Sequence, residues 1–189
     1  MLYLCYNLND KGSSDIMKKI YFVLTYTGTV LSKIIKLRTR NEFSHVSISL
    51  DKELNSMYSF GRKNPYNPFF GGFIQEYKDK GTFKRFKNTK ASIYSLEITD
   101  EQYEIIKDLI AKMQKEKNLY KFNVLGLFAV GLHIKLKFDK SFYCAEFVKF
   151  VLEKSKIENE LPEIIKPEDF RYLKGLDMIY SGFLKEYKV

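Results

Sequence analysis

Residues 43–50 read FSHVSISL, a stretch in which polar and apolar side chains alternate. A period of two is typical of a β-strand, because successive side chains of a strand point to opposite faces of the sheet. The apolar face of this stretch carries Val46, Ile48 and Leu50, and the polar face carries His45, Ser47 and Ser49. The stretch therefore predicts a strand with one core-facing side and a histidine on its polar side.

Further strands and helices are expected around this strand. An apolar run predicts a strand at residues 20–25, and alternation predicts one at residues 90–98. Residues 56–60 are expected as the return strand after a hairpin-like connection at residues 51–55. Apolar residues spaced by three and four positions predict helices that begin near residues 30, 100 and 141. The second of these helices follows a capping box, Thr99-Asp100-Glu101-Gln102. This order predicts an α+β fold in which a compact antiparallel sheet packs against helices.

Two segments stand apart from this pattern. Two prolines and two glycines mark residues 62–72 as a loop, and the aromatic residues between them make it a candidate lid or cleft wall. Residues 124–134 are the most apolar stretch of the chain, but a helix that spans a bilayer needs about 20 residues. We therefore expect residues 124–134 to be a buried core segment.

The start of the chain carries no visible signal peptide, because residues 1–16 lack a basic start followed by an apolar stretch. We expect residues 1–16 to be a disordered extension and residues 17–189 to form a single domain. A soluble, cytoplasmic protein is the corresponding expectation.

The composition and charge of the chain indicate which kinds of partner or cofactor to expect. The formal net charge is +9, but the lysines are spread along the chain and no nucleic-acid-binding motif accompanies them. We therefore expect no nucleic-acid binding, although such a charge favours peripheral contact with an anionic membrane. Phosphate-binding glycine loops and metal-ligand spacings are absent from the sequence, so no cofactor or metal is expected. The oligomeric state stays open.

Cys144 is the first residue that could carry chemistry. Apolar residues at helical spacing follow it, so the cysteine is expected within the first turn of a helix, with Ser141 or Asp139 as the N-cap. The unpaired N–H groups and positive dipole end at such a position stabilise a thiolate. A buried structural cysteine is the alternative, and a bridge between Cys144 and Cys5, the other cysteine of the chain, is another.

His45 is the second such residue, since its strand presents it on the polar side. A helix-start cysteine with a strand-borne histidine matches the thiolate–imidazolium pair of cysteine hydrolases and acyltransferases. His133 is the competing base, because it is the other histidine of the chain. It follows an apolar run and precedes Lys135, so we expect it at the end of an element rather than in a cleft.

These residues resemble a family. The run Phe43-Ser44-His45-Val46-Ser47-Ile48 is similar to the histidine strand of the circularly permuted NlpC/P60 (papain-like) superfamily, in the branch of YiiX- and LRAT-like proteins. The run Tyr143-Cys144-Ala145-Glu146-Phe147-Val148 resembles the cysteine helix of that branch, in which the histidine precedes the cysteine. The resemblance spans about residues 18–172 and implies a permuted papain-like core.

The resemblance also implies roles for the residues. Cys144 would be the nucleophile and His45 the general base. Relatives place a third polar residue on the strand after the histidine strand, and the matching position here is Ser59. A serine hydroxyl can accept a hydrogen bond from the imidazole but supplies no negative charge. Glu76 is the alternative orienting group if the 62–72 loop folds back over the site.

Three functions follow as hypotheses. The first is a cysteine hydrolase that cleaves an amide or ester bond of a small-molecule, peptide or lipid substrate through an acyl-thioenzyme. The second is a lipid acyltransferase or thioesterase, which the apolar segments and positive charge would suit. The third is a catalytically inactive binding module of the same fold, for which Ser59 is the main argument.

Overall fold

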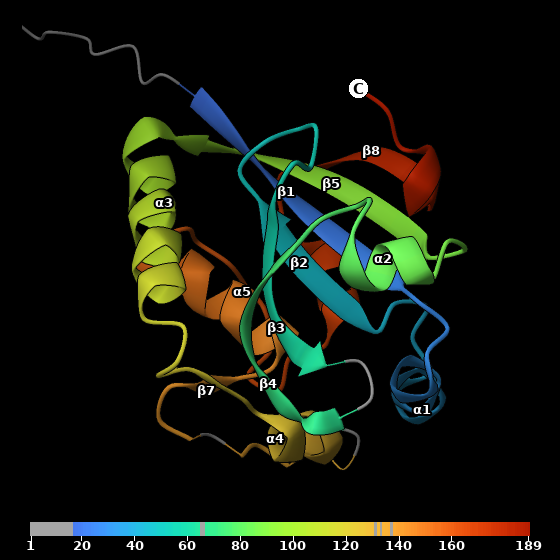
Figure 1. Cartoon of the computed structure of the whole chain (residues 1–189). Helices are drawn as coiled ribbons and strands as arrows, with labels where there is room; N and C mark the ends of the chain where they lie inside the picture. The colour runs from blue at the N-terminus through green and yellow to red at the C-terminus, as the bar shows by residue number, and fades with distance from the viewer. Residues whose placement is uncertain (1–16, 65–66, 131, 133, 137) are drawn as a thin grey trace, which may run out of the picture.

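A six-stranded antiparallel sheet forms the centre of the protein (Figure 1). The computed structural model describes residues 17–64, 67–130, 132, 134–136 and 138–189, with the side chains of residues 31, 38, 39, 64 and 67–70 left aside. The strand order is β4-β3-β2-β1-β5-β8. The six strands are β1 (Met17–Tyr26), β2 (His45–Ser49), β3 (Met57–Asn64), β4 (Asn67–Glu76), β5 (Lys90–Thr99) and β8 (Leu176–Phe183).

Helices cover both faces of this sheet. The longer ones are α1 (Val30–Thr39), α3 (Asp100–Lys115) and α5 (Cys144–Lys154). The shorter ones are α2 (Gly81–Arg85), α4 (Val124–Val130) and the 3-10 helices η1 (Pro167–Tyr172) and η2 (Leu184–Glu186). Two short parallel strands, β6 (Lys121–Phe122) and β7 (Ser141–Phe142), precede α4 and α5 respectively. The expected α+β class and antiparallel sheet are therefore confirmed.

Strand β1 explains why the sheet has a core on each side. Its alternate residues Phe22 and Leu24 belong to the large core beneath α3 and α5. Val23, between them, belongs to a smaller core with Phe83 of α2 and Leu184 of η2. A strand buried on both faces reads as a continuous apolar run, and this is the pattern of residues 20–24.

Helix α5 packs on the larger core through an aromatic cluster. Phe147 is fully buried, and its ring centroid lies 5.2 Å from that of Phe60 on β3 and 5.6 Å from that of Phe73 on β4. Full burial of a phenylalanine side chain contributes about 1.5–3 kcal/mol. This packing fixes the start of α5, and with it Cys144, against strands β2 and β3.

The prediction of a loop over residues 62–72 is wrong. Strand β3 continues to Asn64, and β4 begins at Asn67 and pairs with β3 along the hairpin. Proline at position 68 is compatible with this strand because β4 lies at the edge of the sheet, where one side of the backbone needs no ladder partner. The aromatic side chains expected to form a lid lie outside the described residues.

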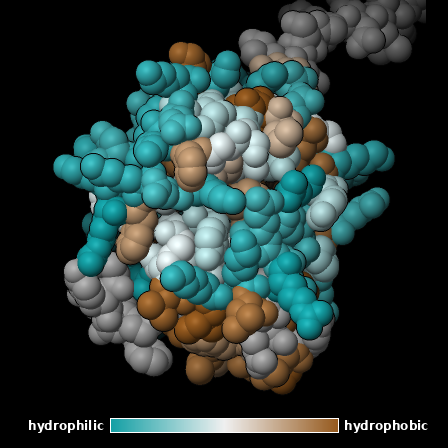
Figure 2. All heavy atoms as spheres, turned by 90° about the vertical axis from the view of Figure 1, so that its right-hand side faces the viewer, coloured by the Kyte–Doolittle hydropathy of each residue, from teal (hydrophilic) through white to brown (hydrophobic). Residues whose placement is uncertain are grey.

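The expectation of a buried segment at residues 124–134 holds only in part. One side of α4 is buried, including Leu127 and Val130, whereas Leu125 and Phe128 are exposed. Figure 2 shows apolar side chains gathered at the lower end of the molecule, where Figure 1 places α4. We call the exposed side chains here the apolar face, and they are Leu125, Phe128, Leu132, Ile134, Leu136 and Phe138. Within the described residues, no helix has both the length and the apolar character needed to cross a bilayer.

Candidate active site

Cys144 is the first residue of α5 and is only 3% exposed. The N-cap is Tyr143 rather than the expected Ser141 or Asp139, because residues 141–142 form strand β7 and the helix begins only after it. The Tyr143 backbone N–H donates to Glu146 Oε2 at 3.1 Å. The backbone N–H groups of the first helical turn have no intrahelical acceptors, so the thiol lies at an electropositive helix end.

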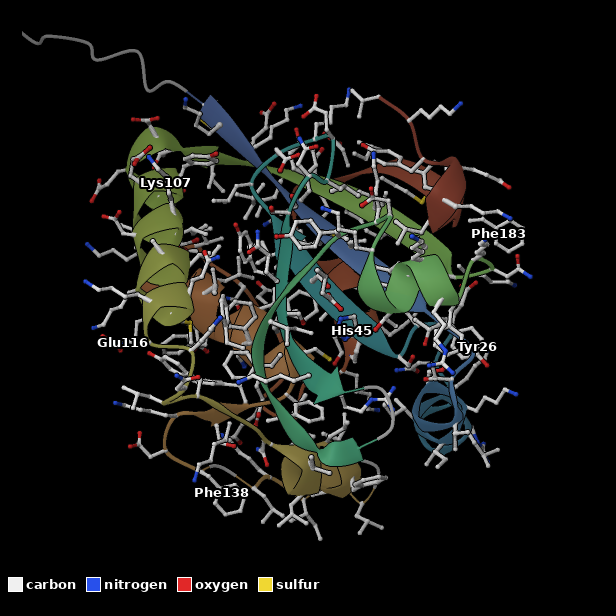
Figure 3. The ribbon with its side chains drawn as sticks, viewed as in Figure 1. Tyr26, His45, Lys107, Glu116, Phe138 and Phe183 are labelled. Atoms are coloured by element: carbon white, nitrogen blue, oxygen red, sulfur yellow. The ribbon has the colours of Figure 1, made fainter. Side chains whose placement is uncertain are left out.

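His45 is the first residue of β2, where it pairs with Thr25 of β1. The backbone just before it is fixed by η1, since Glu168 Oε2 accepts the Phe43 N–H at 3.0 Å. Figure 3 shows the His45 side chain near the middle of the view, beside the start of β2. The polar side of β2 was predicted correctly, but it is not a solvated face, because Ser47 and Ser49 are fully buried.

Glu76 and Ser47 hold the imidazole of His45. The ring Nε2 lies 3.0 Å from Glu76 Oε2 and 3.2 Å from Ser47 Oγ. The Ser47 hydroxyl also donates to the same Glu76 oxygen at 2.5 Å. Ser47 follows His45 by two residues on the same face of β2, whereas Glu76 is the last residue of β4. Two side chains, one from β2 and one from β4, therefore fix one edge of the ring.

Cys144 and His45 meet in one small cavity. Both line a pocket of about 90 Å³ together with Glu76, and the side chain of Cys144 is near enough to His45 to help raise the pKa of the imidazole. The ladder between β2 and β3 pairs Ile48 with Tyr58 and Ser49 with Met57, and among the described residues it does not continue to His45. Gly61 lies beside the pocket, where a Cβ would come 4.0 Å from His45 Cε1 and 2.8 Å from Ile74 Cδ1. The absence of a side chain at Gly61 therefore leaves room next to the ring.

The charges of the site favour an ion pair. Burial alone would lower the pKa of His45, but the carboxylate of Glu76 and the hydrogen bonds with Cys144 and Glu76 outweigh burial and raise this pKa well above 6.5. Burial would raise the pKa of Glu76, but the charge of His45 and the hydrogen bonds from His45 and Ser47 lower it below 4.5. These shifts favour the imidazolium form of His45 and the carboxylate form of Glu76.

Ser59 does not contact His45 in the expected way. Its hydroxyl donates to the backbone carbonyl of Val46 at 2.7 Å, and the residue is fully buried. This bond links β2 to β3 beyond the ladder pairs Ile48↔Tyr58 and Ser49↔Met57. The position next to His45 belongs to Glu76, which reaches it from the edge strand β4 rather than from a folded loop. The assignment of Ser59 as the third group is corrected accordingly.

Two residues of the site, Ser47 and Glu76, are not among the predicted catalytic residues. The period of two in β2 puts the Ser47 hydroxyl on the same side as the His45 imidazole, but the pattern alone indicates no role for Ser47. Glu76 was only the alternative to Ser59, because the loop assigned to residues 62–72 hid the strand that carries it. The sequence signal for Glu76 would have been a β-hairpin through residues 57–76.

Two other sequence candidates and the possibility of a metal site remain to be placed. Cys5 and His133 lie outside the described residues. Among the residues that the structure describes, no group of three or more His, Cys, Asp or Glu side chains is arranged to hold a metal ion.

Comparison with known proteins gives no independent assignment: no family model matches the chain, and no curated protein matches its sequence.

Proposed function

We propose that the protein is a cysteine hydrolase that cleaves an amide or ester bond through an acyl-thioenzyme. The observation that carries this proposal is that Cys144, at the start of α5, lines one pocket with His45 and Glu76, and that Glu76 is bonded to the His45 ring. Nucleophile, base and orienting carboxylate in this order are the three parts that thiol-dependent acyl transfer needs. The order along the chain, with the histidine strand before the cysteine helix, supports a permuted NlpC/P60 core as the fold.

The chemistry follows from the two ring nitrogens. Because Nε2 is engaged by Glu76 and Ser47, Nδ1 is the nitrogen left to exchange a proton with Cys144. The thiol proton first passes to His45, which gives a thiolate–imidazolium pair. The thiolate Sγ then bonds to the substrate carbonyl carbon, whose oxygen becomes an oxyanion. The carbonyl then reforms, the bond to the leaving amine or alcohol breaks, and His45 protonates that group. Water attacks the thioester with the same base, and the acid departs as the proton returns to Sγ.

The start of α5 supports oxyanion stabilisation. The N–H groups of the first turn lack intrahelical partners and lie at the positive end of the helix dipole. The backbone N–H of Cys144 is the closest of these groups along the chain to Sγ. Removal of a single oxyanion-hole donor costs about 10²–10³ in kcat in enzymes of this chemical type.

Glu76 favours the catalytic hypothesis over an inactive binding module. The case for an inactive module depended on a serine as the third group, because a hydroxyl supplies no negative charge. A carboxylate within 3.0 Å of Nε2 stabilises the imidazolium that forms when His45 takes the proton.

Turnover of a neutral ester such as 4-nitrophenyl acetate tests this proposal. The protein should release nitrophenolate faster than Cys144→Ala and His45→Ala, each of which should lose at least 10²-fold in kcat/KM. Lys107→Gln on the surface of α3 serves as the control. Equal turnover by all four proteins would contradict the proposal.

A lipid acyl substrate is the second candidate, and the apolar face is the observation that favours it. Helix α4 carries exposed Leu125 and Phe128 on this face, while its buried Leu127 lines the pocket of Cys144. Helix α1 also lines that pocket through Ser32, and its Val30 is 76% exposed. Exposed apolar patches of this kind mark protein or membrane contact sites. An acceptor alcohol or amine in place of water would make the same reaction an acyl transfer.

Sedimentation with anionic phospholipid vesicles tests this second candidate. The double variant Leu125→Ser/Phe128→Ser should lose binding at least fivefold. Met178→Ser/Phe183→Ser is the matched control, because Met178 and Phe183 are exposed on β8, and Figure 3 shows Phe183 far from Phe138 of the apolar face. Equal binding by the two double variants, or none by the parent protein at low salt, would contradict a membrane-bound substrate.

A further inference from the structure

A second cavity adjoins the pocket of Cys144. It has a volume of about 500 Å³, against about 90 Å³ for the catalytic pocket. Both cavities are lined by Arg62, Ile74, Glu76, Thr82 and Phe83, so they share a wall. The larger cavity continues along strand β4 and reaches the start of α2 and the end of α3. A substrate held at Cys144 could extend into this space.

The lining of the larger cavity is strongly basic. Among its described lining residues are four cations and one carboxylate, namely Arg62, Lys63, Lys80, Lys117 and Glu76. Glu76 already forms an ion pair with His45, so its charge is balanced within the site. The described lining of the cavity next to the reacting groups therefore holds more cationic than anionic side chains.

Arg62 joins the two cavities. It is the cation that lines both, and it lies on β3 beside Gly61, which leaves the space next to the His45 ring. Arg62 is partly buried, and burial lowers the pKa of its guanidinium from the ordinary value. A guanidinium in this position presents several N–H donors in one plane, which suits a carboxylate or phosphate.

We propose that the acyl substrate carries an anionic group, a carboxylate or phosphate, that binds at Arg62 with help from Lys63 and Lys80 while its scissile carbonyl lies at Cys144. This inference rests on the proposed hydrolase function and names the substrate class of that same site. The remaining cation, Lys117, and the polar side chains of Gln75 and Gln114 line the cavity further along β4.

The experiment compares alkylation of Cys144 by iodoacetate and iodoacetamide, which differ in charge and are similar in size. Second-order rates are measured by mass spectrometry for the full chain. The ratio of the iodoacetate rate to the iodoacetamide rate at Cys144 should exceed the ratio for glutathione. It should fall about three- to tenfold in Arg62→Gln and in Lys80→Gln, and also when salt is raised, because each removes or screens nearby positive charge.

Two control variants sharpen this comparison. Lys107→Gln removes the same charge from the exposed surface of α3 and should leave the ratio unchanged. Arg62→Lys keeps the charge and should retain most of the ratio. Lys80 is exposed, so its variant still tests the proposal if Arg62→Gln fails to fold.

Protection experiments distinguish the two sources of negative charge. Inorganic phosphate and glutarate are each added while neutral iodoacetamide alkylates Cys144. Slower alkylation with phosphate alone assigns a phosphate substrate, slower alkylation with glutarate alone assigns a carboxylate, and either protection should vanish in Lys80→Gln.

The two proposals fail in different ways. If iodoacetamide alkylates Cys144 rapidly, but the ratio equals that of glutathione and does not change in Arg62→Gln or Lys80→Gln, the anionic-substrate proposal is overturned and the hydrolase proposal stands. If both reagents leave Cys144 unmodified in the folded protein, the hydrolase proposal fails, and the anionic-substrate proposal fails with it.

Discussion

Replacement of Glu76 by glutamine is the most informative perturbation of the site. The variant keeps an amide oxygen where Oε2 lies 3.0 Å from His45 Nε2, so the hydrogen bond can persist while the negative charge disappears. It is therefore a change of charge at nearly constant shape. Glu76 acts here as a positioning residue, since it touches the imidazole and not the reacting thiol.

The size of the effect follows from the geometry. Opposite unit charges 3.0 Å apart attract by roughly 5 kcal/mol at an effective dielectric constant of 20. Desolvation of both groups offsets much of this attraction, because the side chains of His45 and Glu76 are only 20% and 13% exposed. A hydrogen bond to a charged group contributes about 1.5–3 kcal/mol net, against about 0.5–1.5 kcal/mol for a neutral one. Loss of the charge with the hydrogen bond retained therefore costs about 1–1.5 kcal/mol, which corresponds to a loss of about 5- to 13-fold in rate.

The assay is the rate of Cys144 alkylation by iodoacetamide as a function of pH. Loss of the carboxylate lowers the pKa of His45, so the imidazolium should disappear at lower pH and the alkylation profile should change shape. Glu104→Gln is the control, because Glu104 forms an exposed pair with Lys107 on α3. If Glu76→Gln and the parent protein give superimposable profiles and rates, the role assigned to Glu76 is refuted.

Three further predictions concern the groups around the pair. Ser47→Ala should lower ester turnover about 5- to 15-fold, because it removes a hydrogen bond that contributes about 1–1.5 kcal/mol. Ser59→Ala should lower the free energy of unfolding by about 1 kcal/mol and leave turnover unchanged. Equal turnover in the two variants would contradict the assignment of Ser47, rather than Ser59, to the catalytic site. The contribution of the His45–Glu76 ion pair to the free energy of unfolding in urea should be greatest between pH 4.5 and 6.5. This contribution should fall as the pH rises from 6.5 through the raised pKa of His45. It should also fall as the pH drops from 4.5 through the lowered pKa of Glu76. A Glu76→Gln variant that keeps the same decline above pH 6.5 would contradict this assignment. Phe147→Ala should lower the free energy of unfolding in urea by about 3–5 kcal/mol, because Phe147 is fully buried. Phe183→Ala on exposed β8 is the control and should lower it by less than about 0.5 kcal/mol. Similar values for both variants would contradict the packing described for α5.

Local periodicity predicted the two elements that carry the dyad. The alternation of residues 43–50 placed His45 on a strand, and apolar spacing after Cys144 placed the cysteine at the start of a helix. Both signals are local, because a period of 2 or 3.6 can be read within one segment. The capping box at Thr99 is also local and is present in the structure.

Tertiary pairing determined what the sequence could not reveal. Strand β4 contains proline and glycines, and its only sheet neighbour is β3, so nothing local distinguishes it from a loop. The place of Glu76 beside His45 depends on this long-range pairing. Ser59 lies on β3, the strand after the histidine strand, as predicted, but its hydroxyl donates to the backbone carbonyl of Val46 and not to the imidazole. The final strand β8 has no regular apolar face, because most of its residues are partly or fully exposed, so its sequence carries no strong strand signal.

Detection of the acyl-thioenzyme tests the central claim most directly. The protein is mixed with 4-nitrophenyl acetate, quenched in acid and digested, and the peptide that contains Cys144 is examined by mass spectrometry. One acetyl group on Cys144 is predicted in the parent protein, with at least a tenfold lower yield at early times in His45→Ala. Acetylation that is absent from Cys144, or that proceeds equally fast without His45, would contradict the assignment of Cys144 as nucleophile and His45 as its base.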